Sequence, residues 1–153
     1  MKRIASFSVD HDKITPGMYI SRIDGDITTF DLRTRTPNGG DYMDHRTMHS
    51  VEHMLATFLR NGEIGEHVIY FGPMGCRTGF YLLTRDTLTH AQAIALVKES
   101  MAFVRDFEGE IPGNKKEECG NYLDHDLVGA KEIGGEMYSV LKDWTEQDLQ
   151  YKE

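Results

Sequence analysis

The chain of 153 residues has the length of one domain, with 39% hydrophobic and 27% charged residues, a balance typical of globular proteins and not of disordered ones. Its 17 basic and 25 acidic residues give a net charge of -8. Because no Lys/Arg run forms a basic patch, we expect no binding to nucleic acid or anionic membranes. Lys2 and Arg3 precede no apolar stretch, and no segment reaches transmembrane length, which predicts a cytoplasmic protein without a signal peptide.

The first half of the chain predicts a hairpin followed by a helix. Two β-prone runs, residues 17–22 and 27–33, are joined by the turn sequence DGD. After a loop, Asp44 or Thr47 can cap a helix that runs to about Arg60 and ends at Asn61-Gly62. The buried side of this helix is expected to consist of the apolar residues at helical spacing, Met48, Val51, Leu55 and Phe58.

The second half predicts another hairpin and further helices. Residues 67–71 and 80–84 flank the turn-rich GPMGCRTG, and Thr87 or Thr89 opens a second helix. One face of that helix is expected to carry Ala91, Ile94, Val97, Met101 and Val104. EIPGNKKEECGN is expected to be a loop or a broken helical turn.

A third helix is predicted from Asp126 to about Leu141, although Gly134-Gly135 weakens its middle, and TEQD can cap a last short helix. No repeat or linker divides the chain, so residues 1–153 are expected to form a single domain. Strands that come first, with the helices segregated from them, favour an α+β fold. We expect an antiparallel sheet of about four strands packed against about four helices.

The segment HSVEH carries two histidines one helical turn apart. If residues 49–53 are helical, His49 and His53 share a face and both imidazoles can reach one cation, with Glu52 on the flank of that face. The order H-x-x-E-H is typical of a class of metal hydrolases. Such a pattern also occurs by chance on solvated helices, so the segment alone leaves both interpretations open.

The two cysteines lie in different surroundings. Cys119, in the polar EECGN, can complete a ligand set with the two histidines and leave a fourth position open, as in catalytic sites; the alternative is an exposed thiol. Cys76 lies in the turn PMGCRTG, where Arg77 favours the reactive thiolate; the alternative is a small buried residue. The absence of a secretory signal disfavours a disulfide between them.

Together, HSVEH, PMGCRTGFY and the ECG at 118–120, in this order, resemble the S-ribosylhomocysteine lyase (LuxS) family. SFSVDH at 6–11, FDLR at 30–33, PN at 37–38 and HDLVGA at 125–130 extend the resemblance over most of the chain. It implies a metal-assisted aldose–ketose isomerisation followed by β-elimination. The products would be L-homocysteine and 4,5-dihydroxypentane-2,3-dione, the precursor of the quorum-sensing signal autoinducer-2.

The resemblance also assigns roles to individual residues. The ligands of one divalent metal, Fe(II) first with zinc or cobalt as substitutes, match His49, His53 and Cys119. The two general acid/base groups match Glu52 and Cys76. Residues that line the ribose of the substrate match Ser6, His11 and Arg33. The resemblance further implies a homodimer with two active sites at the subunit interface.

Two positions depart from the pattern of the family. The family commonly has an aspartate, associated with the homocysteine end of the substrate, where this chain has Tyr70, and usually a glutamate where it has Val128. Neither position is expected to take part in metal binding or proton transfer.

Two other functions are compatible with the motifs. A small metallopeptidase would use HSVEH with a downstream ligand such as Glu132, but such enzymes are usually much larger and both cysteines would stay unexplained. A non-enzymatic domain with a structural metal would normally need four protein ligands, and the motifs supply three.

Overall fold

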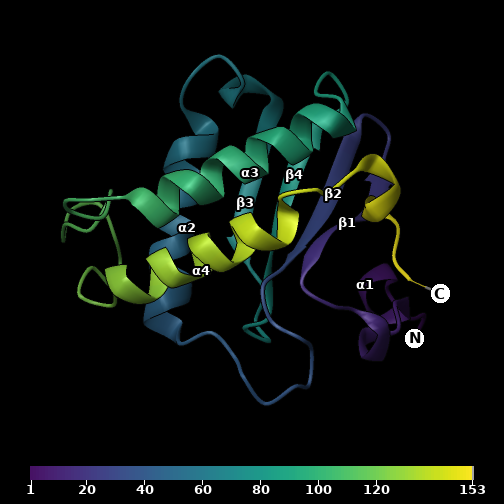
Figure 1. The fold of residues 1–153 in the computed structure, drawn as a ribbon, viewed down its shortest axis with the longest axis horizontal. Coiled ribbons are helices and arrows are strands. Elements are labelled where there is room, and N and C mark those ends of the chain that lie inside the picture. Colours follow the sequence, from purple (N-terminus) through teal and green to yellow (C-terminus); the bar gives the residue numbers. More distant parts are fainter. Residues whose placement is uncertain (153) are drawn as a thin grey trace.

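A computed structural model of the chain, which describes residues 1–152, contains one four-stranded antiparallel sheet. Strands β1 (Gly17–Asp24), β2 (Ile27–Arg33), β3 (Val68–Pro73) and β4 (Gly79–Arg85) lie in the order β1-β2-β4-β3. Helix α2 (His45–Arg60) packs against β3, while α3 (His90–Asp106) and α4 (Leu127–Leu141) pack on each other across the sheet (Figure 1). The predicted α+β architecture is confirmed.

The shorter helices lie near the ends of the chain and before β3. They are α1 (Ala5–Ser8), η1 (His11–Lys13), η2 (Gly65–His67) and η3 (Glu146–Leu149). The segment TEQD does form a capped turn, as predicted, since Thr145 and Asp148 bond reciprocally, but the turn is a 3-10 helix. Sequence patterns did not indicate α1 or η1, which contain no buried residue and therefore have no apolar periodicity.

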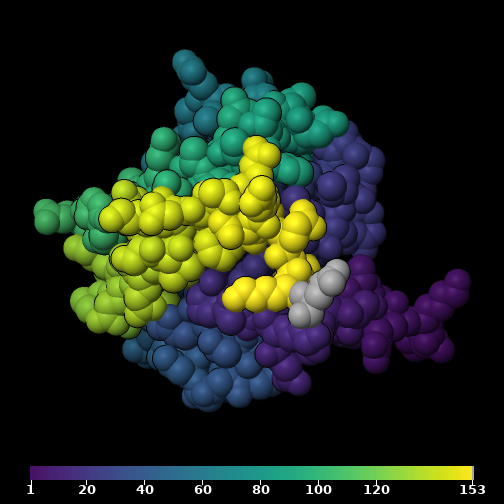
Figure 2. Space-filling model, turned by 45° about the vertical axis from the view of Figure 1, so that its right-hand side comes forward, coloured from purple at the N-terminus to yellow at the C-terminus, as the bar shows by residue number. Residues whose placement is uncertain are grey.

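Strand alternation gives the sheet two different faces. The face toward the helices is apolar and fully buried at the cross-strand neighbours Met18, Leu32, Phe80, Phe30 and Leu82. The opposite face carries Asp31, Arg33 and Tyr81 from the same strands. The yellow C-terminal segment lies against the purple N-terminal part of the chain (Figure 2), and Tyr151 reaches Asp31 on this polar face.

Polar side chains fix where the three long helices begin. The carboxylate of Asp44 accepts from the Arg46 N–H at 2.7 Å, and the carboxylate of Asp126 accepts from the Gly129 N–H at 3.0 Å. Thr89, not Thr87, caps α3 through a reciprocal pair with Gln92. In the first turn of α3, Ala91 is exposed and therefore does not share the buried face of Ile94, Val97, Met101 and Val104, whereas Ala93 is buried.

The glycine pair does not interrupt α4. A Cβ built at Gly134 would lie 2.7 Å from the backbone nitrogen of Arg105 and 2.8 Å from the carbonyl oxygen of Met101. The missing side chain therefore lets α4 approach the backbone of α3 closely, and this packing outweighs the low helix propensity of glycine.

Residues 107–126 connect α3 to α4 without a long regular element. The Glu118 and Cys119 N–H groups both donate to the Lys115 carbonyl oxygen, which makes a broken helical turn, one of the two alternatives expected for this segment. No helix within residues 1–152 is both long and apolar enough to cross a membrane.

Candidate metal centre

HSVEH forms part of α2, as its spacing predicted. The rings of His49 and His53 lie edge to face, with centroids 4.5 Å apart and planes at 87°, and both residues are half-buried. The helix holds them in place because its other side is anchored in the core by Val51, Met54 and Leu55.

The loop between α3 and α4 brings two more ligand-type side chains to these rings. His49, His53, Cys119 and His125 each offer a ligand atom within 4.8 Å of the others. We call these four residues the imidazole–thiol cluster. Its size fits one metal ion per chain, with nitrogen and sulfur donors suited to a borderline divalent metal.

The hydrogen bonds around two of the rings favour metal binding. The Nδ1 atoms of His49 and His53 lie 2.7 Å and 2.8 Å from the carbonyl oxygens of Asp124 and Pro112. A carbonyl oxygen can only accept, so each Nδ1 carries the proton and each Nε2 keeps its lone pair for a metal. The Sγ atom of Cys119 lies 3.4 Å from His49 Nε2, which places the thiol on the same side.

His125 is a member of the cluster that the sequence motifs missed. Its Nδ1 lies 3.0 Å from the Ser50 hydroxyl, and its Nε2 is buried without a hydrogen-bond partner in residues 1–152. Burial, followed by repulsion from His49 and His53, lowers the pKa of His125 to about 4, so the ring is neutral near pH 7. The sequence did contain one hint, because His125 follows Cys119 by six residues. HDLVGA, which begins with His125, was interpreted only as the start of a helix.

Glu52 lies beside the cluster and lines a cavity of about 660 Å³. The same cavity is lined by His53, Pro112 and Glu118, and by Tyr70 from β3. The carboxylate predicted to transfer protons is therefore half-buried at the edge of a space large enough for a small polar substrate. By contrast, Glu132 is exposed on α4 and is not a member of the cluster, which disfavours a metallopeptidase.

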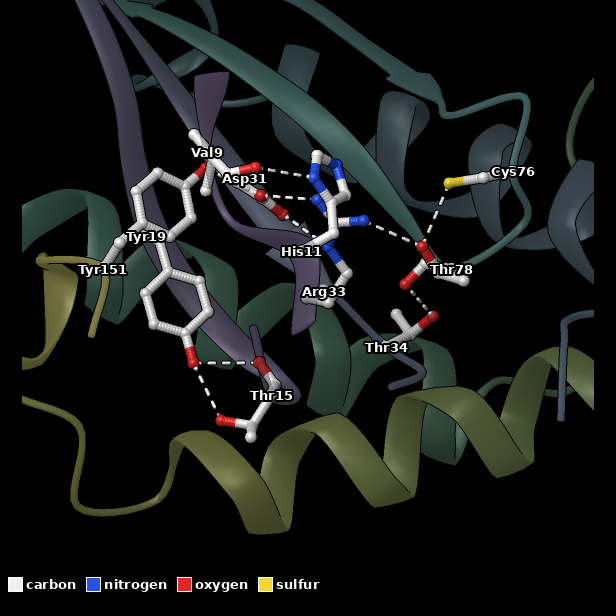
Figure 3. A network of polar contacts seen from close by, with 10 residues as sticks. All are labelled: Val9, His11, Thr15, Tyr19, Asp31, Arg33, Thr34, Cys76, Thr78 and Tyr151. Carbon is white, nitrogen blue, oxygen red and sulfur yellow. Dashed lines mark hydrogen bonds and ion pairs between the residues drawn. The ribbon is translucent and has the colours of Figure 1, made fainter. Parts of the chain in front are cut away.

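A second polar group occupies the other face of the sheet (Figure 3). The Arg33 guanidinium pairs with the Asp31 carboxylate through two hydrogen bonds of 2.7 and 3.1 Å, and both side chains are almost completely buried. Arg33 also donates to the Thr78 hydroxyl at 2.8 Å, and that hydroxyl lies 3.0 Å from Cys76 Sγ. We call these four residues the arginine–thiol network.

Electrostatics keep the arginine–thiol network charged. Burial opposes the charge of Arg33, but the hydrogen bonds and negative charge of Asp31 raise the pKa of Arg33 above its ordinary value. Tyr151 donates to Asp31 at 2.7 Å and stacks on Tyr19. Burial and the Asp31 carboxylate raise the pKa of Tyr151, so the phenol stays protonated.

The remaining predicted substrate residues lie on the N-terminal segment. The imidazole of His11 is held through Nδ1, 2.9 Å from the Val9 carbonyl oxygen. Ser6 lines a separate cavity of about 330 Å³, together with Ser21, Tyr70 and Tyr81. Tyr70, the departure noted above, thus borders both this cavity and the one beside Glu52.

The two polar groups are not joined within one chain. No hydrogen bond or ion pair among residues 1–152 connects Cys76 to Glu52 or to the imidazole–thiol cluster. Cys76 is exposed and Cys119 is partly buried, and both thiols are free, in agreement with the expectation that they form no disulfide.

Comparisons with known proteins agree on one family. The model of the family "S-Ribosylhomocysteinase (LuxS)" matches residues 4–148. An S-ribosylhomocysteine lyase of Clostridium acetobutylicum is 46% identical over 100% of both chains. Two more proteins of the same name are similar. The one from Phocaeicola vulgatus is 43% identical over 99% of this chain and 98% of the relative, and the one from Borreliella burgdorferi is 40% identical over 99% of both chains. The chain belongs to the S-ribosylhomocysteinase (LuxS) family.

Proposed function

We propose that this protein is an S-ribosylhomocysteine lyase that releases L-homocysteine and 4,5-dihydroxypentane-2,3-dione, the precursor of a quorum-sensing signal, in the cytoplasm. The observation that carries the proposal is the convergence of His49, His53 and Cys119 beside the cavity that Glu52 lines. The family membership supplies the substrate, since the relatives carry the name of this lyase. The free thiol of Cys76 supplies the second proton carrier.

His49, His53 and Cys119 would hold one divalent ion, Fe(II) first, with zinc or cobalt as substitutes. When bound, such an ion acts as a Lewis acid that acidifies the C–H next to a sugar carbonyl. The protein supplies the two ring orientations, because the carbonyl groups of Asp124 and Pro112 keep the Nδ1 protons in place.

Cys76 and Glu52 would carry protons between carbon and oxygen atoms of the open-chain sugar. Two such shifts move the carbonyl from C1 to C3 without any change in redox state. The C–H at C4 then becomes acidic, and its removal expels the sulfur at C5 as homocysteine. The final step breaks one C–H and one C–S bond, forms one C=C bond and gives the departing thiol a proton.

The arginine–thiol network supports the role of Cys76 as a base. Arg33 has no acceptor atom, so the Thr78 hydroxyl must accept from it and keeps its own hydrogen free to donate to the Cys76 thiolate. Arg33, together with His11 and Ser6, is proposed to contact the ribose hydroxyl groups of the substrate.

A homodimer would bring the two polar groups together. Because no hydrogen bond or ion pair among residues 1–152 joins Cys76 to the imidazole–thiol cluster of its own chain, we propose that an active site with all of the proposed residues needs a second copy. An isologous two-fold interface would place the arginine–thiol network of one chain opposite the cluster of its partner, and would form two equal sites.

The direct test is turnover of S-ribosyl-L-homocysteine by protein purified without oxygen. We expect release of one free thiol per substrate consumed, measured with a thiol-reactive dye. The matched control is His53→Ala, which lacks one proposed ligand and should release no thiol. Wild-type protein that holds a metal and leaves the substrate intact would contradict the proposed function.

A further inference from the structure

The hydrogen bonds at Nδ1 divide the three imidazoles of the cluster into two kinds. His49 and His53 face carbonyl oxygens, which fixes their protons on Nδ1. His125 faces the Ser50 hydroxyl instead, and a hydroxyl can both accept and donate. The tautomer of His125 therefore depends on where the hydroxyl hydrogen of Ser50 points.

A neighbouring bond orients the Ser50 hydroxyl. The oxygen of Ser50 accepts from the backbone N–H of Asp126 at 2.8 Å. Within residues 1–152, the only acceptor found for the Ser50 hydrogen is Nδ1 of His125, at 3.0 Å. We therefore assign Nδ1 of His125 as the acceptor of the Ser50 hydrogen, which puts the ring proton on Nε2. The tautomer is the opposite of that in His49 and His53.

The orientation of the ring agrees with this assignment. His125 stacks on His49, with centroids 4.2 Å apart and planes 20° from parallel. A histidine binds a metal through a lone pair in the plane of its ring. Two rings that lie almost parallel, one above the other, cannot both direct in-plane lone pairs at the same ion.

The second ring nitrogen of His125, Nε2, is the one left for another partner. It is buried and has no hydrogen-bond partner among residues 1–152. Since Nδ1 is occupied by Ser50, Nε2 is the nitrogen left to face the other members of the cluster. A buried N–H in such a position requires an acceptor, and under the proposed function a sugar bound at the cluster would supply one.

We infer that His125 is not a metal ligand but a hydrogen-bond donor, whose Nε2–H binds the sugar oxygen on which negative charge develops when the neighbouring carbon loses its proton. This role rests on the proposed function, because it needs a carbonyl substrate at the cluster. The donor is held in place before the charge appears, so it stabilises the enediolate more than the starting sugar. Ser50 is the positioning residue that sets the tautomer.

Nitrogen-15 NMR of zinc-loaded protein tests the tautomer without any substrate. We expect His49 and His53 to carry the proton on Nδ1 and bind zinc through Nε2, and His125 to carry its proton on Nε2. In Ser50→Ala, the His125 signals should shift toward a mixture of tautomers. A zinc-bound Nε2 at His125 would overturn the inference.

Substitutions of His125 test the donor in the reaction. Phenylalanine removes the N–H, and glutamine can place an amide N–H near the position of Nε2. Both variants should keep about one metal per chain, and their cobalt-loaded forms should show the wild-type absorption spectrum, because the ligands are unchanged. The kcat of His125→Phe should fall about 100-fold or more, as for a lost oxyanion donor, and His125→Gln should recover part of it.

These readouts separate failure of the inference from failure of the proposed function. Loss of metal from His125→Phe, with its melting temperature preserved, or turnover close to wild type, would contradict the donor role. A wild-type protein that binds metal and shows the expected tautomers, but does not convert S-ribosylhomocysteine, would contradict the proposed function and the substrate contact together.

Discussion

The two proposed proton carriers occupy very different surroundings. Glu52 lies on a helix beside the imidazole–thiol cluster, and Cys76 lies in an exposed turn at the end of the arginine–thiol network. Neither side chain belongs to the proposed ligand set. Proton transfer and metal binding can therefore be disturbed separately.

Substitution of either proton carrier should lower turnover and spare the metal. We expect Glu52→Gln and Cys76→Ala to lose at least about 100-fold in kcat, the usual effect of a lost general acid or base. Metal content, measured by atomic emission, should stay near one ion per chain. If Cys76 only fills space, Cys76→Ala would cost stability and leave homocysteine release near wild type, which would refute the mechanism.

Alkaline pH should lower the stability of the protein through the ionisation of Tyr151. The pKa of Tyr151 is raised from 10.0 in the folded state, so above about pH 10 the unfolded chain releases this proton and the folded chain retains it. The contribution of Tyr151 to the free energy of unfolding should therefore be constant below about pH 10 and decrease as the pH rises further. Tyr151→Phe keeps the stacking on Tyr19 and removes the ionisable group. Urea unfolding at pH 8 and 10.5 should show a smaller loss of stability for this variant than for wild type.

Among the elements, regular strands and helices were the most predictable. β2 has the predicted bounds, and α2 begins one residue after Asp44, one of its two predicted caps. α4 begins one residue after its predicted start, Asp126, which is its cap. Alternation and capping are local signals, which explains this agreement. The position of His49, Glu52 and His53 on one helix was predictable because their spacing is also a local signal. The position of His125 beside these residues was harder to predict. His125 reaches the cluster through the path of the loop formed by residues 107–126, and no periodicity in the sequence specifies that path.

The burial of the polar face of the sheet was also not predictable from local sequence patterns. Asp31 and Arg33 alternate with Phe30 and Leu32 as in an ordinary strand with one solvated face, yet both charged residues are buried. What covers them includes Tyr151, far away in sequence. Long-range contacts of this kind carry no local signal, so the sequence indicated Arg33 only through family resemblance.

The close approach of α3 and α4 predicts different effects for two adjacent glycines. Gly134→Ala would place a Cβ less than 3 Å from the backbone of α3 and should destabilise the protein by about 1–3 kcal/mol. Gly135→Ala meets only the flexible side chain of Arg105, at 3.6 Å or more, and should be neutral or stabilising by up to about 1 kcal/mol. Thermal unfolding measures both. Equal effects would show that propensity, not packing, governs this pair.

For the whole molecule, shared active sites predict recovery of activity on mixing. Cys76→Ala and His53→Ala should each be inactive alone, and each should have the mass of a dimer in solution. If Cys76 acts with the partner's cluster, a mixed dimer contains one intact site and one doubly altered site. Mixing equal amounts, with subunit exchange, should restore about a quarter of wild-type turnover, because half of randomly formed dimers are mixed.

A site contained within one chain gives the opposite result. Every site in the mixture would then lack either Cys76 or His53, and activity would not return. The control is a mixture of Cys76→Ala with Glu52→Gln, which should behave like the first pair, since Glu52 lies beside the cluster.

Metal removal should loosen one segment before it affects the rest of the fold. His49 and His53 are held by carbonyl groups of the same loop that supplies Cys119 and His125. Metal-free protein should melt at a lower temperature and be cleaved by protease within residues 107–126 first. Cleavage elsewhere, with this loop still protected, would contradict the coupling.

The shared loop also has a consequence for the lifetime of the bound metal. One segment supplies the proposed thiolate ligand, Cys119, and the backbone oxygens that orient two imidazoles. Rotation of a single side chain should therefore not be enough to release an ion. Release requires the segment to swing open, and the rate at which a chelator strips the metal should then become independent of chelator concentration. That limiting rate would equal the rate constant for local opening of residues 107–126, so metal release would report how often this segment unfolds locally.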